Sequence, residues 1–365
     1  MKWVRLLLVI WIIILLAFIA NEQWNLTDEV KEMSLQVMED EADPKVEEPT
    51  ESKVEEPESS NPVVETAPSS TSENSLVSYM GKSVEDMKSV VGEPARVDPT
   101  PYGYDWWVYD EEGSYLQVGV QDGKVVSLYT LESRNLIQDL SVGRDYDDLK
   151  NSLSFKEEVV VETGGGTYRF QLKEEELKAR PLLSISDDVY AQLYFDTYTN
   201  ELSSIRLLNA ETLVKHQPYE LYYRGELPQL PSTVPSEWEG IETGVEAQIF
   251  DISNAMRTRF GLAELEWFEP VSRVAYGHSK DMALDNYFSH VSPEGDGLQE
   301  RLKRGEVYYV TAGENIAAQY PDSIAVVEGW LNSEGHRKAM LNDGYTHLGV
   351  GVYQYHYTQN FLEKP

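Results

Sequence analysis

Apolar residues recur at helical spacing near the start of the last third of the chain. They stand three or four positions apart, at Val245, Ile249, Ile252, Met256 and Phe260. Because residues at this spacing lie on one face of an α-helix, the pattern predicts an amphipathic helix. Gly261 marks the position where that helix is expected to stop.

A second helix is predicted from Pro270, since proline is favoured in the first turn of a helix. Its apolar stripe contains Val271, Val274 and Met282, and His278 falls on the same stripe. We therefore interpret His278 as a hydrogen-bonded core histidine rather than as a ligand.

Short helices and strands are predicted for the rest of this segment. We expect a helix at 297–302, a strand at 308–318, a helix from 321 to 335, and strands at 348–353 and 357–362. His290 would lie in the loop that follows the helix from Pro270, and His336 would directly follow the helix that closes at Gly335.

The middle of the chain contains two copies of a loose pattern. The copies open at Gly81-Lys82 and Gly143-Arg144, and each later contains a strand-like stretch, YLQVGV from Tyr115 or YAQLYF from Tyr190. This pattern predicts a duplicated unit of one short helix followed by antiparallel strands.

Aromatic side chains are dense in the first copy, at Tyr102, Tyr104, Trp106, Trp107 and Tyr109. Aromatic residues at strand spacing are typical of a sheet core, so we interpret them as core residues. A ligand face that stacks sugars or peptides is the alternative. His216, further along, has no nearby ligand partners in the sequence and is expected at the surface.

Prolines interrupt the pattern at 228–240, which predicts a linker between a domain at 76–227 and a domain at 241–365.

At the other end of the chain, residues 1–20 contain an apolar run from Leu6 to Ala20 that follows Lys2 and Arg5. The run predicts a transmembrane signal anchor with a cytoplasmic N-terminus and the remaining chain outside the cell membrane. Cleavage as a signal peptide, followed by secretion, is the alternative, although no small residue stands two positions before Ala20.

Composition changes this picture in three ways. Residues 21–75 are acidic, rich in Pro, Ser and Thr, and contain the near repeat KVEEPTES and KVEEPESS, which predicts a disordered linker. The whole chain has 30 basic and 63 acidic residues and a formal net charge of −33, which argues against a nucleic acid partner. It has no cysteine, which excludes disulfides, thiolate nucleophiles and cysteine-ligated metals.

Two imidazoles and a carboxylate carry the candidate chemistry. His290 ends the string YFSH, Glu314 lies in GENIA and His336 lies in WLNSEGHR. The two imidazoles would suit Zn²⁺ or another divalent ion, with Glu314 as a further ligand or as a base toward bound water. The alternative is that Glu314 hydrogen-bonds both imidazoles and fixes the loops.

The strings around these residues resemble the CAP superfamily, which includes cysteine-rich secretory proteins, venom antigens and plant pathogenesis-related proteins. The resemblance covers residues 241–362 and is to the bacterial, cysteine-free form. The matching strings run in family order: HSKDMA, NYFSH, SPEGD, GENIA, GWLNSEGHR, HLGVGV and YTQNF. The preceding domain is similar to the one that accompanies such modules in Gram-positive bacteria.

The resemblance implies an α-β-α sandwich with a cleft that holds two histidines and two acidic residues. His290, Glu314 and His336 match three of these positions. The fourth, three positions after the helix tryptophan, is Ser333 here, so the site is one carboxylate short. Glu334 is adjacent, but neighbouring helical residues do not share a face.

One histidine resembles a family residue without matching its place. His356 begins the string HYTQ, which occurs in eukaryotic members, but it follows the GVG strand rather than preceding it. We therefore assign the family role to His336.

The expected fold class is α+β, with a C-terminal α-β-α sandwich and a duplicated α+β N-terminal domain, preceded by a transmembrane helix and a disordered linker. The expected function is a non-catalytic binding or structural module of the cell envelope, with a peptide, a lipid or another envelope protein as its ligand. The alternative is a metal-dependent hydrolase of peptide or cell-wall substrate. No GxSxG string or cysteine supplies an activated nucleophile.

Overall fold

The structure, a computed structural model, describes residues 75–111, 114–132, 137 and 140–364 of the chain. All of them fall within one unit, Glu48–Pro365. The predicted anchor at 1–20 and nearly all of the predicted linker at 21–75 lie outside the described residues. No helix within the described ranges is long and apolar enough to cross a membrane.

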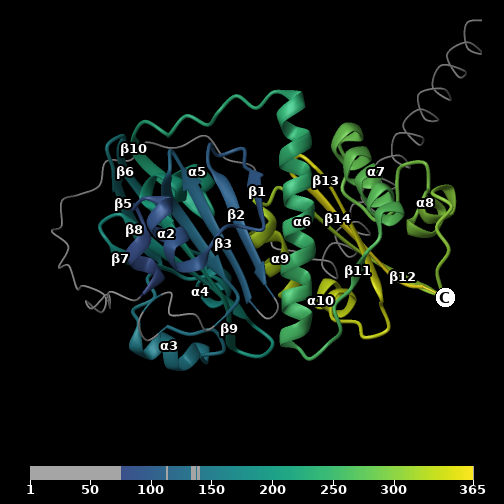
Figure 1. Cartoon of the computed structure of the whole chain (residues 1–365), viewed down its shortest axis with the longest axis horizontal. Helices are drawn as coiled ribbons and strands as arrows, with labels where there is room; N and C mark the ends of the chain where they lie inside the picture. The colour runs from purple at the N-terminus through teal and green to yellow at the C-terminus, as the bar shows by residue number, and fades with distance from the viewer. Residues whose placement is uncertain (1–74, 112–113, 133–136, 138–139, 365) are drawn as a thin grey trace, which may run out of the picture. The chain divides into compact units, whose positions relative to one another are not determined.

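A seven-stranded antiparallel sheet forms the body of the N-terminal domain (Figure 1). Its order is β1 (Arg96–Pro99), β2 (Asp105–Glu111), β3 (Ser114–Gln121), β4 (Lys124–Thr130), β9 (Glu201–Asn209), β8 (Val189–Asp196) and β7 (Leu182–Ser186). The predicted stretch YLQVGV lies in β3 and YAQLYF lies in β8. The order β2-β3-β4 is mirrored by β7-β8-β9, as a duplicated unit requires.

Shorter elements surround this sheet. The helices are η1 (Leu76–Tyr79), α2 (Val84–Val91), α3 (Tyr146–Ser152), α4 (Glu174–Ala179) and α5 (Ala210–His216). A second sheet has the order β10 (Glu220–Gly225), β6 (Gly166–Gln171) and β5 (Glu158–Thr163). Ser83 and Asp145 precede α2 and α3, and their side chains accept hydrogen bonds from the first backbone amides of these helices.

The dense aromatic residues of the first copy are mainly core residues, as predicted. Tyr102, Tyr104, Trp106 and Tyr109 are buried, and Trp107 is half-buried. The first three belong to a core cluster that also contains residues of the C-terminal domain. The two domains are therefore joined through a shared apolar core.

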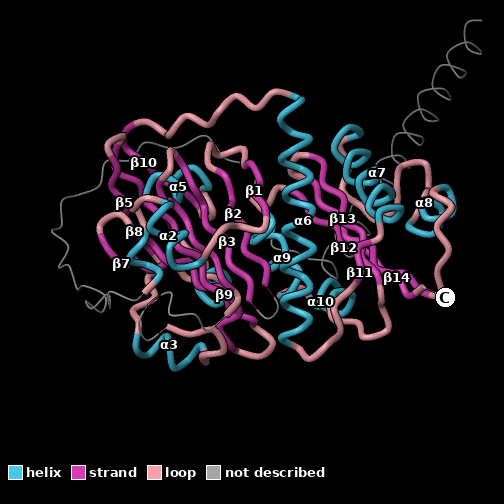
Figure 2. The backbone as a smooth tube through the Cα atoms, viewed as in Figure 1, coloured by secondary structure: helices cyan, strands magenta, loops and turns pink. Residues whose placement is uncertain are grey.

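The C-terminal domain is built on a four-stranded sheet that lies between helices (Figure 2). Its order is β11 (Glu266–Trp267), β13 (His347–Tyr353), β14 (His356–Glu363) and β12 (Thr311–Ala318). The helices are α6 (Pro235–Arg259), α7 (Glu269–Asp285), α8 (Leu298–Arg304), α9 (Ser323–Leu331) and α10 (Glu334–Met340). One face of the sheet packs on α6 and α9 and the other packs on α7.

The predicted apolar stripe of the first helix is confirmed, because Ile249, Ile252 and Met256 are fully buried in α6. The helix begins earlier than predicted, at Pro235, inside the stretch predicted as a linker. This start is consistent with Pro235 in the first turn, where a missing backbone N–H costs nothing.

The single helix predicted at 321–335 is wrong: it is two helices, α9 and α10, and His336 lies in the first turn of the second. The break falls at Asn332, whose side chain donates to the Phe195 carbonyl and accepts from the Thr197 backbone N–H. Contacts with the N-terminal domain therefore set this boundary.

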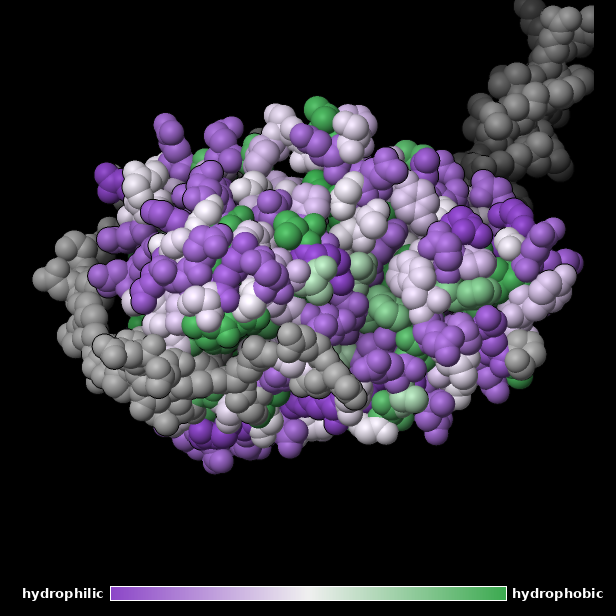
Figure 3. Space-filling model, viewed as in Figure 1, coloured by the Kyte–Doolittle hydropathy of each residue, from purple (hydrophilic) through white to green (hydrophobic). Residues whose placement is uncertain are grey.

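Hydrophilic residues predominate on the face of the molecule shown in Figure 3, with apolar residues in small separate areas. This agrees with the high proportion of charged residues, which is 25% of the chain.

Candidate functional site

Glu314 lies at the centre of the candidate site. It belongs to β12, an edge strand, and its side chain is only 4% exposed. Arg301 Nη2 donates to both carboxylate oxygens at 2.7 Å, and His290 Nδ1 lies 2.9 Å from Oε1. Charged hydrogen bonds of this kind are about twice as strong as neutral ones. The structure therefore brings two of the three predicted residues into direct contact.

Arg301 is a member of this cluster that sequence reasoning missed. It comes from α8, is buried, and its Nη1 donates to the backbone carbonyls of His290 and Asp296, both at 3.0 Å. The guanidinium therefore ties the loop of His290 to both α8 and Glu314. In the sequence, Arg301 stands next to the apolar Leu302 in a predicted short helix. This position indicates that Arg301 could be buried, but it does not indicate its partner.

His290 lies in the loop after α7, as predicted, and its side chain is 38% exposed. The helix ends at Asp285, and the next residue, Asn286, has a positive φ of 53° that turns the chain out of the helical direction. Because Nδ1 faces Glu314, Nε2 is the ring nitrogen that is left for another partner.

His336 reaches the same region from α10. Its backbone carbonyl accepts a hydrogen bond from Asn315 Nδ2 at 3.1 Å, and Asn315 is the next residue after Glu314. Burial, and after it the charge of His290, lowers the pKa of His336 to about 4. The Asn315 contact places the backbone of His336 beside the strand of Glu314, and a pKa of about 4 means that His336 is neutral at pH 7.

His278 is buried in α7, as the apolar stripe predicted. It is nevertheless a neighbour of the site, because its Nε2 lies 4.0 Å from Glu314 Oε1. Burial is the main cause that lowers its pKa to about 4. The sequence pattern indicated the burial of this ring but not its neighbour.

The remaining candidates lie away from this cluster. Ser333 immediately precedes α10, and the exposed side chain of Glu334 pairs with Lys338 on the surface. His356 pairs with Ala318 across the strands, whereas Glu314 pairs with Asn360. Four positions along a strand span about 13 Å, so His356 is remote from Glu314.

Comparisons with known proteins identify both domains. Residues 250–362 match the cysteine-rich secretory protein family (CAP), and residues 80–219 match the CAP-associated N-terminal family. An uncharacterized membrane protein of Bacillus subtilis, YlbC, is 46% identical over 290 residues, which are 79% of this chain and 84% of that protein. The chain belongs to the CAP family.

Two crystal structures resemble this CAP protein over both domains. An extracellular protein with an SCP domain from Bacillus anthracis is 40% identical, with a TM-score of 0.76 over 83% of this chain and 100% of that one. A cysteine-rich secretory protein from Staphylococcus aureus is 25% identical, with a TM-score of 0.72 over 80% of this chain and 94% of that one.

The candidate site does not fit a metal ion held by all three predicted residues. Both oxygens of Glu314 accept from Arg301, and one of them also faces His290. Within the part of the chain that the structure describes, no group of three or more His, Cys, Asp or Glu side chains could hold a metal ion. Glu314 is thus placed to orient an imidazole rather than to ligate an ion.

A hollow of about 490 Å³ adjoins the cluster on the side of α7 and α8. The hollow is lined by His278 and by charged residues of both signs, which are Arg273, Asp281, Glu294, Asp296, Arg301 and Arg304. Charges of both signs therefore border a space large enough for several amino-acid side chains.

His216 lies between the CAP domain and its associated domain, and its predicted surface position is wrong. Its ring stacks on Tyr102, with centroids 3.9 Å apart, and its Nε2 lies 3.1 Å from the Tyr104 hydroxyl. Burial lowers its pKa well below the usual value. Its polar neighbours Tyr104 and Asp322 are more than a hundred positions away, so local sequence could not indicate them.

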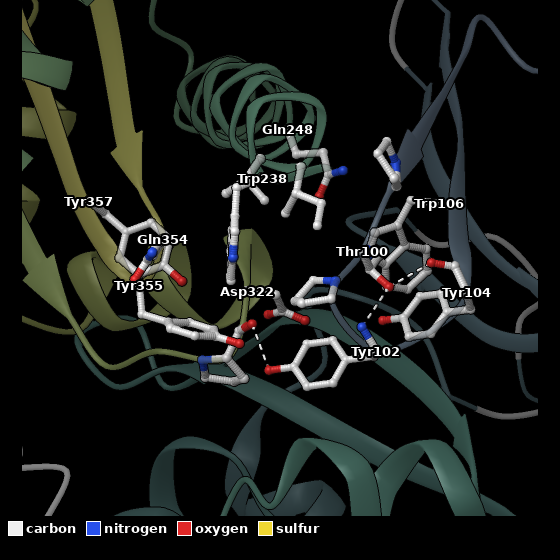
Figure 4. A pocket seen from close by; sticks show the side chains of 15 residues that line it. Thr100, Tyr102, Tyr104, Trp106, Trp238, Gln248, Asp322, Gln354, Tyr355 and Tyr357 are labelled. Carbon is white, nitrogen blue, oxygen red and sulfur yellow. Dashed lines mark hydrogen bonds between the residues drawn. The ribbon is translucent and has the colours of Figure 1, made fainter. Parts of the chain in front are cut away.

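Asp322 and Arg206 form a buried ion pair across the same interface, at 2.7 Å. Figure 4 shows Asp322 close to Tyr102, whose hydroxyl donates to the Pro321 carbonyl at 3.0 Å. The gap lined by these aromatic residues has a volume of about 20 Å³, which is room for about one water molecule. This volume excludes a sugar or a peptide there.

A second contact region joins the β8–β9 turn to the segment that carries His336. Arg337 Nη2 lies 2.9 Å from Asp196 Oδ2, and Asn332 Oδ1 accepts from the Thr197 hydroxyl at 2.8 Å. The Glu328 carboxyl, one helical turn earlier, accepts from the hydroxyls of Ser203 and Ser204. The associated domain therefore contacts α9 and also α10, the helix that carries His336.

Proposed function

We propose that this CAP protein is tethered to the cell membrane and acts outside the cytoplasm as a non-catalytic binding module of the cell envelope. The apolar run at 1–20 with its preceding Lys2 and Arg5 supports the tether. The Bacillus subtilis relative is named a membrane protein, and the Bacillus anthracis relative is described as extracellular.

The ion pair between Arg301 and Glu314 is the observation that carries the binding role. Both oxygens of Glu314 accept from the Arg301 guanidinium, and Oε1 also faces His290, so the carboxylate is already engaged and is not placed to act on a substrate. The chain has no cysteine that could serve as a nucleophile. Binding is the function that this neutralised cluster and its adjoining hollow support.

The ligand that suits the hollow is a peptide with charges of both signs, such as a segment of another envelope protein. Arg273 and Arg304 are both strongly exposed at its border, and Asp281 and Glu294 provide the opposite charge. A lipid tail would instead require an apolar lining.

Synthetic peptides of mixed, purely acidic and purely basic charge would test this proposal in a fluorescence polarisation assay with the full-length chain in detergent. We expect mixed-charge peptides to bind and the double variant Arg273→Glu, Arg304→Glu to weaken binding roughly tenfold or more. Arg169→Glu, a partly exposed arginine of the associated domain that lies outside the hollow, is the control. Equal binding by both variants, or no binding by any peptide, contradicts the proposal.

We also propose that a divalent ion at this site is held by His290 and His336, with Glu314 orienting His290. A ligating imidazole usually presents its second nitrogen to a carboxylate, and the contact between His290 Nδ1 and Glu314 has that geometry. Calorimetric titration with Zn²⁺ is expected to lose its binding signal in the His290→Ala, His336→Ala pair. Unchanged zinc affinity in this pair contradicts the proposal.

A further inference from the structure

The sheet face beneath α7 carries a second polar side chain beside Glu314. Asn360 of β14 is the direct partner of Glu314 across the antiparallel pair, and Gly349 of β13 is its partner on the other side. Directly opposite residues share one face of a sheet. That face is the one beneath α7, since a Cβ on Gly349 would lie 2.3 Å from the backbone nitrogen of Ser272.

The amide of Asn360 is fully buried, and neither its oxygen nor its nitrogen has a hydrogen-bond partner among the described residues. Buried amides are nearly always hydrogen-bonded, because an unpaired one loses its contacts with water and gains nothing in return. The Asn360 amide therefore points to a bound polar molecule beside Glu314.

The ring of His278 approaches the same place from α7. Tyr287 donates its hydroxyl proton to Asp281 Oδ2 at 2.6 Å, so its oxygen is left to accept from His278 Nδ1 at 3.5 Å. This arrangement puts the ring proton on Nδ1 and leaves a lone pair on Nε2. The Nε2 atom is buried, has no hydrogen-bond partner in the described part of the chain, and lies 4.0 Å from Glu314 Oε1.

Two hydrogen-bond acceptors thus face each other across 4.0 Å. A molecule that donates twice satisfies both, and the adjacent Asn360 amide can donate to that molecule in turn. The charge of Glu314 is already balanced by Arg301, so a neutral donor fits better than a cation. Water has this size, this charge and these two donors.

We propose that one buried water molecule bridges His278 Nε2 and Glu314 Oε1 and is held there by Asn360. This water makes His278 a positioning residue of the cleft, in addition to a core residue. The water would hold the Glu314 carboxylate from the side of α7, while the same carboxylate orients His290 through Nδ1.

Nitrogen-15 and water-contact NMR on the full-length chain in detergent, with labelled histidine, tests this directly. The ring nitrogen signals of His278 are assigned as those that disappear in the His278→Asn variant. We expect shifts typical of the neutral Nδ1–H form and a cross-peak between this ring and a long-lived water. Asn360→Leu should abolish that cross-peak, whereas Ser279→Ala, which removes a buried hydroxyl contact with Thr358 on the same face, should retain it.

Tyr287→Phe provides a second test that does not alter the buried amide. It removes the acceptor for Nδ1, and we expect the ring of His278 to shift toward a mixture of the two neutral forms. A protonated ring in the wild-type chain, the absence of any water contact, a signal that depends on added Na⁺ or K⁺, or a water contact that persists in Asn360→Leu each overturns the proposal.

Discussion

Among the single residues of the site, Arg301 determines how the negative charge of Glu314 is balanced. Its guanidinium balances the charge of Glu314 and also holds the backbone of the His290 loop. Both partners of this ion pair are buried, so neither charge is screened by water. Removal of one partner leaves the other as an uncompensated buried charge.

The first prediction compares two arginines of α8. Arg301→Ala is expected to lower the free energy of unfolding by about 3–5 kcal/mol, because a buried carboxylate is left unpaired. Arg304→Ala is expected to lower it by about 0–1 kcal/mol, because its pair with Asp296 is exposed. Equilibrium urea unfolding measures both. Similar losses in the two variants would show that the Arg301 pair is not buried in solution.

Single residues also show where sequence reasoning reaches its limit. The pattern placed His278 in the core and the family strings gathered His290, Glu314 and His336. Arg301 and His216 were missed or misplaced, because their partners come from other elements. The apolar period of a helix predicted the burial of His278 but not its neighbours, and it gave no indication that His216 is buried.

At the scale of elements, α7 and the sheet meet in unusually close contact. A Cβ on Gly351 would lie 1.8 Å from the backbone nitrogen of Tyr276 and 2.3 Å from the carbonyl carbon of Ala275. Glycine in β13 therefore permits the helix to approach, and this approach brings His278 to Glu314. The glycines of the string HLGVGV therefore allow α7 to pack closely on β13, and the string also matches the family.

The second prediction contrasts two glycines. Gly351→Ala is expected to destabilise the protein by about 3 kcal/mol or more, since neither backbone can yield without separating the helix from the sheet. Gly277 lies in α7, and a Cβ added there would meet no neighbouring atom within 4 Å. Gly277→Ala should therefore stabilise the protein by about 0.5–1 kcal/mol through helix propensity. Thermal unfolding checks both, and a tolerated Gly351→Ala contradicts this packing.

At the scale of the whole molecule, Glu328 links the CAP domain to its associated domain. Burial is the main cause that raises the pKa of Glu328 to about 7, although hydrogen bonds from Ser203 and Ser204 and the nearby charge of Arg259 oppose it. The charge of Asp196 acts in the same direction as burial. The interface therefore favours the protonated carboxyl.

The third prediction concerns pH. The folded protein holds the Glu328 proton up to about pH 7, whereas the unfolded chain releases it near pH 4.5. The stability from this group is thus complete below about pH 4.5 and is lost as pH rises to 7, by on the order of 3 kcal/mol.

Glu328→Gln should remove that loss, because the amide hydrogen-bonds the same two hydroxyls without ionising. Urea unfolding of both proteins between pH 4.5 and 8 measures the difference. The advantage of the variant should grow with pH and level off above 7. Glu246→Gln, within the CAP domain, should show the same trend independently, because burial raises the pKa of Glu246 to about 7 as well. A difference that does not change with pH would show that Glu328 is ionised throughout.

The sequence by itself determined the fold class, the main apolar stripes, and the family strings that mark the cleft. These features depend on local periodicity and on short strings, which one stretch of chain contains completely. Only the tertiary structure showed that Arg301 pairs with Glu314 and that His216 is buried between the domains. It also showed that the helix breaks at Asn332. Those contacts join residues from different elements, and their energies depend on burial that arises only when the elements pack.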